Sequence, residues 1–368
     1  MKVLHLIKSL GRGGAEMLLQ ETLKLHNHAE FEFHYIYFLP WKDQMVAGLK
    51  ANGGIVLNLP AKDNIRIMLQ AGKIIRYIRN NQIDLVHCHL PWAGFVGRII
   101  HRRTGVPVIY TEHNKQERYH RATKLINHYT FNWQTKAIAV SADVEASIRQ
   151  WIHPKIPVQT ILNGVNTAYF VRQPEAGKAL RQAHGIDEQA FVVGTIAVFR
   201  FQKRLKEWID VFKALHTKHP AVRGIVVGDG ILNNEIRAHL KASGMEPYIL
   251  FPGLQTDVVP WLSAMDVFMM SSEFEGLPVA LLEAMSMECV AVCTDAGGIK
   301  EVIRDRQDGF MVPLDQWQQL AEALEYLYLH PEERNRYAKA ARQRVLETFS
   351  LKAMVQQLES VYRETGKK

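Results

Sequence analysis

Arg200, Lys203 and Lys206 are three of the cations in a seven-residue segment of the second half of the chain. They follow a predicted buried strand and lie where the next helix is expected to begin. Cations in this position suit a diphosphate, because each charge-assisted hydrogen bond contributes about 1.5–3 kcal/mol once it is shielded from water. A solvated helix end without a ligand is the alternative interpretation.

Two glutamates, Glu275 and Glu283, flank the start of another predicted helix. Glu275 lies in the loop, Pro278 suits the first helical position, and Glu283 lies more than one turn inside the helix. A carboxylate accepts two hydrogen bonds from a vicinal diol, so the pair could hold two sugar rings of one ligand. Alternatively, Glu275 is a helix-start acid and Glu283 an ordinary surface residue.

A glycine loop, Gly11-Arg12-Gly13-Gly14, joins the first predicted strand to the first predicted helix. Glycines let an anion approach the backbone amides at a helix N-terminus. The spacing is not GxGxxG, because Glu16 stands where the third glycine is required, and no acidic residue ends the following strand. A dinucleotide cofactor is therefore disfavoured. A simple tight turn is the alternative.

Three of the histidines in or after predicted strands are candidate ligands: His87, His89 and His113. His113 follows a strand end, where parallel sheets bind ligands, although a hydrogen-bonded structural role is the alternative. His87 and His89 share one face of a strand, as a metal pair would. No third ligand lies nearby in the sequence, so we expect no metal site.

The elements that must position these residues alternate between strand and helix, which predicts parallel βαβ units. Ser141 is expected to cap the helix that follows it. The predicted strands cover 3–7, 31–39, 84–89, 107–111, 136–140, 191–198, 224–227, 249–251, 267–270 and 290–293. The predicted helices include 15–26, 65–79, 204–216, 232–242, 281–287 and 351–364. A proline-rich linker at 154–174 separates two doubly wound domains, and the cleft between their sheets is the expected ligand site.

The composition is that of a globular protein: of 368 residues, 47% are hydrophobic and 22% charged. This length predicts two domains and excludes a disordered or low-complexity chain. No run of about 18 apolar residues predicts a membrane span, and the first residues are too short an apolar stretch for a signal peptide. The three cysteines form no CxxC pair, so we expect free thiols in a reducing cytosol.

The net charge of +8 is unevenly distributed. Residues 1–165 hold 21 basic and 11 acidic residues, whereas the remainder holds 24 and 26. The first domain is therefore expected to face something anionic: a membrane surface, a phosphorylated acceptor or nucleic acid. A solvated basic face without a partner is the alternative. Nucleic acid is disfavoured because the chain has no RNP-like aromatic motif and no zinc-finger spacing.

In combination, the motifs resemble those of the retaining glycosyltransferases of family GT4, which have the GT-B fold. The resemblance runs in order from residue 11 to residue 301. It rests on Gly13-Gly14-Ala15-Glu16, His113, Asn163-Gly164-Val165-Asn166, Arg200 with its lysine, Phe251-x-Gly253, the Glu275 and Glu283 pair, and Gly297-Gly298-x-x-Glu301. It implies two Rossmann-like domains: an acceptor-side domain at 1–167, completed by a returning helix at 352–368, and a donor-binding domain at 168–351.

The resemblance also implies a role for each matching residue. Arg200 and a lysine would bind the donor diphosphate and stabilise it as the leaving group. Lys203 is favoured because it fits the lysine that opens the helix. Lys206 is held in reserve because the family usually has a longer spacing after the arginine, which Lys206 satisfies. Glu275 would hold the transferred sugar and Glu283 the ribose. Further contacts would come from the amides of Gly13, Gly14, Gly276 and Leu277, from His113 near the reacting carbon, and, on the acceptor side, from Glu16 and His89.

The implied reaction is transfer, with retention, from a UDP-sugar or, as second choice, a GDP-sugar to a hydroxyl of a lipid-linked or cell-surface glycan. The chain contains no Asp-x-Asp, the usual metal clamp of other glycosyltransferases. Arg200 and Lys203 would then replace the charge of a metal ion, and no cofactor is expected. A UDP-sugar epimerase on the same scaffold and a non-catalytic sugar-nucleotide-binding protein are the alternatives.

An anionic membrane is the expected partner of the basic first domain. Basic residues beside apolar anchors suit an anionic bilayer, so we expect a cytoplasmic protein bound peripherally to the inner membrane face. The residues on which this expectation rests are Arg66, Lys73, Arg76 and Arg79 on one helix, and Arg98, Arg102 and Arg103 beside Trp92 and Phe95 on another.

Overall fold

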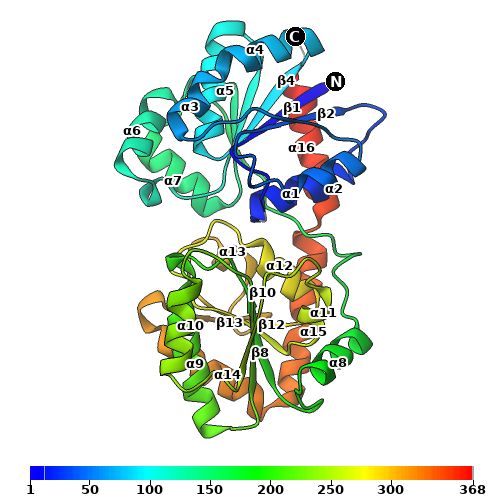
Figure 1. Ribbon diagram of the computed structural model, residues 1–368, viewed down its shortest axis with the longest axis vertical. Coiled ribbons are helices and arrows are strands. Elements are labelled where there is room, and N and C mark those ends of the chain that lie inside the picture. The colour runs from blue at the N-terminus through cyan, green and yellow to red at the C-terminus, as the bar shows by residue number, and fades with distance from the viewer. Residues whose placement is uncertain (12, 367–368) are drawn as a thin grey trace. The chain divides into compact units, whose positions relative to one another are not determined.

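The computed structural model describes residues 1–11 and 13–366. Arg12 of the predicted glycine loop and the last two residues of the predicted helix 352–368 lie outside the described residues. The chain folds into two compact units (Figure 1). Unit 1 comprises Met1–Asn163 and the segment that begins at Leu351, and unit 2 comprises Gly164–Ser350.

Unit 1 is built on a parallel sheet of seven strands in the order β3-β2-β1-β4-β5-β6-β7. Strands β1, β2, β4 and β5 are almost wholly buried, as expected when helices cover both faces of a parallel sheet. The five strands predicted in this half are confirmed. The strands are β1 (Lys2–Ile7), β2 (Glu32–Tyr37), β3 (Ile55–Asn58), β4 (Leu85–His89), β5 (Val108–Glu112), β6 (Lys136–Ala139) and β7 (Val158–Thr160).

The helices of unit 1 follow the predicted alternation, with one correction. The predicted helix 65–79 is two helices, which meet at Gln70. The helix is interrupted there because the amide of Gln70 bonds to the carbonyl of Ile67, three residues back, rather than to the carbonyl four residues back. The side chain of Gln70 donates to the carbonyl of Pro60. Ser141 caps its helix as predicted, accepting from the amide of Val144 at 3.1 Å. The helices are α1 (Gly14–Leu23), α2 (Val46–Ala51), α3 (Asn64–Leu69), α4 (Ala71–Asn81), α5 (Pro91–Thr104), η1 (Gln116–Arg118), α6 (Arg121–Thr130), α7 (Ala142–Ile152) and α16 (Leu351–Gly366).

Helix α16 belongs to unit 1 although all of unit 2 precedes it in the chain. The Tyr362 hydroxyl lies 2.8 Å from Nδ1 of His87 on β4. Glu359 contacts Nδ1 of His26 at 3.0 Å, and Arg363 donates two hydrogen bonds of 2.7 Å to the carboxylate of Glu30. These contacts close the apolar core around β1 and β2.

Arg98 corrects the predicted membrane face of α5. Its guanidinium is fully buried among the rings of Phe95, Tyr110 and Phe131, and it donates to Asn127 at 2.8 Å and to other side chains. Burial lowers its pKa to about 10. Arg98 is therefore part of the core and does not reach the surface.

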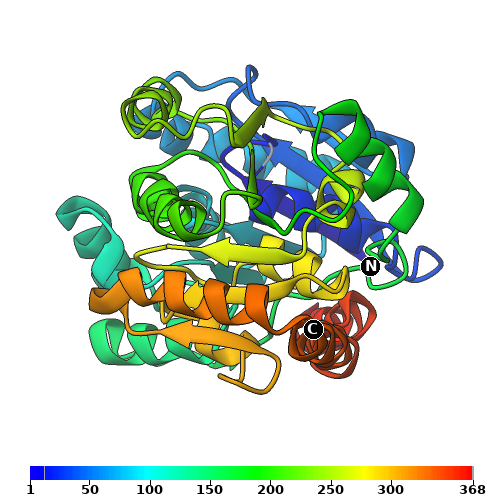
Figure 2. The same cartoon turned by 90° about the horizontal axis from the view of Figure 1, so that it is seen from below.

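Unit 2 is a second parallel sheet, of six strands in the order β10-β9-β8-β11-β12-β13, and the five predicted strands are confirmed. Its helices cover both faces of the sheet (Figures 1 and 2), and Trp208 and Phe212 stack in its core. The strands are β8 (Val192–Ile196), β9 (Arg223–Val227), β10 (Ile249–Gly253), β11 (Val267–Met270), β12 (Val290–Thr294) and β13 (Gly309–Val312). The helices are α8 (Pro174–Ala183), η2 (Phe201–Lys203), α9 (Leu205–Lys218), α10 (Asn233–Ala242), α11 (Val259–Ser263), α12 (Val279–Ser286), α13 (Ile299–Val302), η3 (Leu314–Gln319), α14 (Leu320–Leu329) and α15 (Pro331–Thr348).

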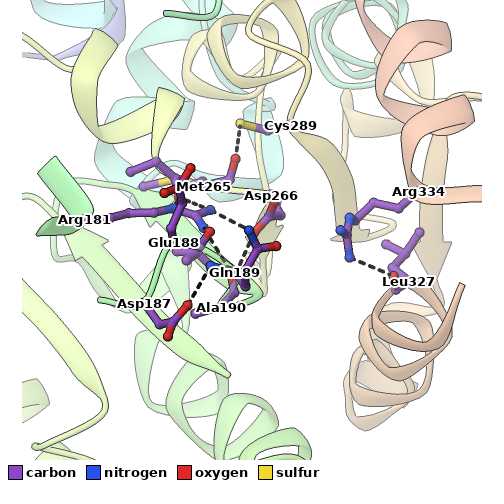
Figure 3. Close-up of polar contacts among 12 residues, drawn as sticks. Arg181, Asp187, Glu188, Gln189, Ala190, Met265, Asp266, Cys289, Leu327 and Arg334 are labelled. Atoms are coloured by element: carbon purple, nitrogen blue, oxygen red, sulfur yellow. Dashed lines mark hydrogen bonds and ion pairs between the residues drawn. The ribbon is translucent and has the colours of Figure 1, made fainter. Parts of the chain in front are cut away.

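The predicted linker 154–174 contains the boundary between the two units, at Asn163 and Gly164; it also contains β7 and ends where α8 begins. One local prediction about a proline is wrong. Pro278 is the residue before α12 rather than its first residue, with a ψ of 113° that is extended and not helical. Helix α8 is fixed to unit 2 by the buried Arg181, which donates to the carbonyl of Ala264 at 2.7 Å and to Asp266 at 3.0 Å (Figure 3).

The three cysteines are free, as predicted, and all three are buried. Among residues 1–11 and 13–366, no helix combines the length and apolar character needed to cross a membrane.

Candidate functional site

The switch point of the unit 2 sheet lies between β8 and β11, where the strand order reverses direction. Ligands of doubly wound sheets bind beside such a point, outside the carboxyl ends of the strands. Arg200 and Lys203 follow β8, and Glu275 follows β11. The topology therefore brings these three predicted residues to one place.

Hydrogen bonds join the two loops at this switch point. The Ser271 hydroxyl donates to the carbonyl of Arg204 at 2.8 Å, and the amide of Glu273 donates to the carbonyl of Gln202 at 2.8 Å. Between them, the Lys203 ammonium donates to Oε1 of Glu275 at 2.6 Å. The same oxygen accepts from the Ser272 hydroxyl at 2.7 Å. Both charged side chains of this ion pair are largely buried, which strengthens their attraction relative to a surface pair.

The other two cations are placed differently. Arg200 is exposed, and in the part of the chain that the structure describes its guanidinium has no ion-pair partner. Lys206 forms an ion pair with Glu235 on α10, away from Glu275. The structure therefore brings Lys203, and not Lys206, to the predicted sugar-binding carboxylate.

Two glycines, Gly297 and Gly298, pack closely against the backbone of the Glu275 loop. A Cβ on Gly297 would lie 2.1 Å from the carbonyl oxygen of Glu275, and one on Gly298 would lie 1.7 Å from that of Gly276. Gly297 also has a φ of +63°, which side chains rarely adopt. Only glycine fits this approach, which explains the Gly297-Gly298 motif of the sequence.

Glu283 lies on α12 directly after this loop and is buried, which excludes its interpretation as an ordinary surface residue. Leu277 is also buried, and Gly276 is partly exposed. The loop and the first turn of α12 thus present backbone amides next to Glu275, as an anion or a hydroxyl-rich ligand requires.

A third loop at the same edge was missed by the sequence analysis. Gly228-Asp229-Gly230 follows β9, and the amide of Phe199 donates to the carbonyl of Asp229 at 2.9 Å. A Cβ on Gly228 would lie 1.9 Å from the carbonyl oxygen of Ala197. The glycine-x-glycine spacing directly after a strand was the signal that could have identified it.

In unit 1 the switch point lies between β1 and β4. Gly13 precedes α1 with extended backbone and, as a glycine, offers no side chain of its own to cap the helix. Glu16, in the first turn, accepts from the Ser9 hydroxyl at 3.0 Å. A Cβ on Gly13 would lie 2.4 Å from Oε2 of Glu16. The amides near Gly13 and Gly14 therefore begin α1 at the carboxyl end of β1, as predicted.

His113 follows β5 and is held by the buried carboxylate of Glu112. Oε1 of Glu112 accepts from the amide of His113 at 3.0 Å and from the Tyr119 hydroxyl, and Oε2 accepts from Tyr110 at 2.9 Å and from Gln116 at 2.7 Å. Burial raises the pKa of Glu112. Burial lowers the pKa of His113 to about 4, so its imidazole is neutral at physiological pH, with Nε2 unpartnered in the structure.

Next to His113, three buried histidines form a cluster: His5, His87 and His89. Nδ1 of His5 lies 3.0 Å from Nε2 of His89, and the rings of His89 and His113 are 5.8 Å apart. A cavity of about 30 Å³ adjoins the cluster, and its lining includes all three histidines, His113 and apolar residues of α1 and α16. Burial lowers the pKa of His87 to about 3 and holds the pKa values of His5 and His89 well below their usual range.

These three histidines also bear on the prediction that His87 and His89 lack a third metal ligand. The fold supplies one, His5, with the ligand atoms within 4.8 Å of one another. However, His87 contacts Tyr362 at 2.8 Å through Nδ1 and Thr111 at 2.7 Å through Nε2. Metal binding through His87 would break one of these bonds, so the arrangement fits a hydrogen-bonded histidine cluster better than a preformed metal site.

The comparisons with known proteins agree with this geometry. Residues 12–169 match the family described as Glycosyltransferase Family 4, and residues 177–344 match the family described as Glycosyl transferases group 1. The chain belongs to glycosyltransferase family GT4. It is a glycosyltransferase with two Rossmann-like domains of the GT-B type, as the motifs predicted.

Relatives of this glycosyltransferase match it over most of its length. The putative glycosyltransferase EpsD of Bacillus subtilis is 27% identical, with 94% of this chain and 96% of that protein covered. The UDP-Gal:alpha-D-GlcNAc-diphosphoundecaprenol alpha-1,3-galactosyltransferase of Escherichia coli is 24% identical, covering 81% and 80%. Among solved structures, Anabaena HepE in complex with UDP and glucose has a TM-score of 0.89 at 21% identity, covering 99% of this chain and all of that one.

Proposed function

We propose that this glycosyltransferase transfers a hexose, with retention and without a metal ion, from a UDP-sugar to a hydroxyl of a lipid-linked or cell-surface glycan. A GDP-sugar is the second choice of donor. The complex of HepE with UDP and glucose and the diphosphoundecaprenol acceptor in the name of the Escherichia coli relative support these choices. We further propose that it acts at the cytoplasmic face of a membrane, bound peripherally, and uses no cofactor.

The observation that carries the proposal is the Lys203–Glu275 ion pair beside the unpaired Arg200 at the switch point of unit 2. An ammonium has three donor hydrogens. Lys203 can therefore keep Glu275 oriented while it also donates to a phosphate oxygen. The oriented carboxylate of Glu275 would then accept from hydroxyls of the transferred sugar, and Arg200 would bind the other phosphate.

The chemistry assigned to these residues is electrostatic. As the bond between the anomeric carbon and the diphosphate breaks, negative charge grows on the leaving phosphate, and preformed cations such as Lys203 and Arg200 stabilise it most in that state. The acceptor oxygen forms the new bond to carbon on the same face, and its proton passes to the departing phosphate oxygen. His113, neutral because its pKa is lowered to about 4, would serve as a hydrogen-bond partner of the sugar and not as a cation.

Binding of the donor is tested by thermal unfolding with a panel of UDP-glucose, UDP-galactose, UDP-N-acetylglucosamine and GDP-mannose. A ligand that binds only the folded state raises the midpoint. We expect a rise with at least one UDP-sugar, reduced in Arg200→Ala and Glu275→Ala. No rise with any of these nucleotide sugars would contradict the proposal.

Turnover is tested by slow hydrolysis of the bound donor, followed as release of UDP, with and without EDTA. We expect release by the wild type in both conditions and little release by Glu275→Ala. Loss of turnover in EDTA would contradict the metal-free mechanism. Conversion of the donor into an isomeric UDP-sugar would instead indicate an epimerase, and binding without turnover a non-catalytic protein.

A further inference from the structure

Helix α6 of unit 1 has its polar and apolar faces in the opposite orientation from most surface helices. Its inner face carries Thr123 and Asn127, which are buried. Asn127 accepts from the buried Arg98 at 2.8 Å and donates to Gln116 at 2.8 Å. Its outer face carries Leu125 and Tyr129, which are 58% and 68% exposed. A surface helix normally buries its apolar side chains, so the outer face of α6 is suited to an apolar environment.

Two tryptophans extend this apolar surface. Trp133 follows the end of α6, Trp151 lies near the end of α7, and both are exposed. The carbonyl of Trp151 lies 3.3 Å from Nδ1 of His128, which fixes Trp151 beside α6. We call Leu125, Tyr129, Trp133 and Trp151 the α6 patch. Exposed apolar residues are common singly, whereas a group of four large side chains on neighbouring segments marks an interaction surface.

Cations stack directly on the aromatic rings of the α6 patch. The ammonium of Lys124 lies 5.4 Å from the ring centre of Trp151, and the guanidinium carbon of Arg102 lies 5.1 Å from that of Trp133. Helix α6 itself contains no Asp or Glu. Further exposed cations nearby in the chain are Arg103, Arg121 and Lys155.

The acidic residues on the neighbouring elements are engaged with other cations. Glu117 and Asp143 both bind the Lys115 ammonium, at 3.2 and 3.1 Å, and Glu145 binds Arg149 at 2.7 Å. The cations on and around α6 outnumber these three carboxylates, so the charge around the α6 patch is positive. The patch therefore combines a positive rim with an apolar, aromatic centre.

We propose that the α6 patch is the surface through which unit 1 binds an anionic lipid bilayer. Tryptophan and tyrosine prefer the boundary between water and hydrocarbon, and each nearby lysine or arginine is attracted to anionic headgroups. An apolar face flanked by cations is the pattern of helices that lie in this boundary. This inference rests on the proposed function, and it locates the proposed membrane association at the α6 patch.

This location overlaps only partly with the surface expected from the sequence. Arg102 and Arg103 of that surface lie near the α6 patch, whereas Arg98 is buried, and the exposed basic residues of α3 and α4 are the competing site. On α3, Ile65 and Leu69 are 73% and 75% exposed. These two residues resemble Leu125 and Tyr129 in exposure and in belonging to unit 1, so they provide a matched control.

The test is co-sedimentation of the full chain with vesicles of phosphatidylcholine alone or with about one third phosphatidylglycerol, at low and high salt. We expect binding to the anionic vesicles that weakens at high salt. The double variant Leu125→Ser with Tyr129→Ser should bind at least about tenfold more weakly. The control, Ile65→Ser with Leu69→Ser, should bind within about twofold of the wild type.

Three results would overturn the inference: no binding of the wild type to anionic vesicles, equal binding of the α6 double variant, or loss of binding only in the α3 control. Because all four side chains are exposed, both variants should unfold at the wild-type temperature. If the unfolding temperature of the α6 variant is much lower, the double variant Lys124→Glu with Arg121→Glu takes its place. Hydrolysis of a soluble UDP-sugar should be unchanged in both variants. A wild type that binds vesicles but no nucleotide sugar would contradict the proposed function and leave the α6 patch supported.

Discussion

At the scale of single residues, the Lys203–Glu275 ion pair links the two predicted parts of the donor site. The sequence predicted both residues but not their contact, because they are 72 positions apart and only the strand order makes them neighbours. The same holds for His5, which joins His87 and His89 through sheet pairing. Residue type and position were readable from the sequence, and long-range contacts were not.

Lys203→Ala should lower donor turnover by about 10- to 100-fold, since a charge-assisted hydrogen bond is lost and Glu275 is left buried without its counter-ion. Lys206→Ala is the matched control, because it removes the neighbouring lysine that pairs with Glu235. It should stay within about twofold of the wild type. Release of UDP from the donor identified by thermal unfolding measures both. Equal losses in the two variants would contradict the assignment of Lys203.

Glu112→Gln should destabilise the protein by about 1–3 kcal/mol and lower turnover. Its carboxylate accepts from two tyrosines, a glutamine and the amide of His113, whereas the amide group of a glutamine can accept at only one atom. We expect turnover to fall because the Glu112 carboxylate fixes the backbone of His113, the next residue, through the amide hydrogen bond. Denaturant unfolding and UDP release test this together. An unchanged midpoint would show that these hydrogen bonds do not hold the loop.

At the scale of elements, the sequence predicted all of the inner strands and one edge strand, β10, and missed the edge strands β3, β7 and β13. β3 and β7 have four and three residues, and all of these residues are partly or fully exposed. Such short edge strands carry little periodicity, so their assignment depends on pairing with the neighbouring strand. The break between α3 and α4 was missed for a similar reason, because Gln70 bonds to Pro60 in a preceding loop.

Gly298→Ala should strongly reduce donor binding, because its Cβ would collide with the backbone oxygen of Gly276 and push the Glu275 loop. The expected destabilisation is about 1–3 kcal/mol. Gly72→Ala is the control: it lies in α4 with no heavy atom near its added Cβ, and it should stabilise the protein by about 0.4–1 kcal/mol. Thermal unfolding with and without the UDP-sugar measures both effects. A Gly298→Ala variant that binds donor normally would contradict the role of this glycine.

At the scale of the whole molecule, the sequence predicted two doubly wound domains correctly because alternating buried strands and helices permit few other arrangements. The uneven charge also indicated that the first half of the chain faces an anionic partner, but the predicted membrane surface was wrong in including Arg98. A buried arginine and an exposed one have the same sequence signal. Only its partners Asn127, Gln134 and Thr130 distinguish the two.

The protein should lose stability as the pH falls below about 6.5, and unit 1 should lose more than unit 2. His87 and His113 have pKa values lowered to about 3 and about 4, so between these values and 6.5 the unfolded chain binds protons that the folded chain does not. Each such histidine lowers the free energy of unfolding by up to about 1.4 kcal/mol per pH unit. Urea unfolding from pH 7.5 to 5 measures the slope.

Two variants control this slope. His113→Asn removes one of the buried groups and should flatten the dependence on pH. His153→Asn, at an exposed position, should follow the wild type. A wild-type stability that is constant or rises on acidification would contradict the prediction.

Helix α16 has a consequence for how the chain is made. Unit 1 needs Tyr362 and Glu359 to cover His87 and His26, yet the ribosome translates the whole of unit 2 before it reaches them. Unit 2 is contiguous and can finish folding during synthesis. The half that is translated first is therefore completed last, and until then the nascent polypeptide carries an unfinished sheet that chaperones or proteases can recognise.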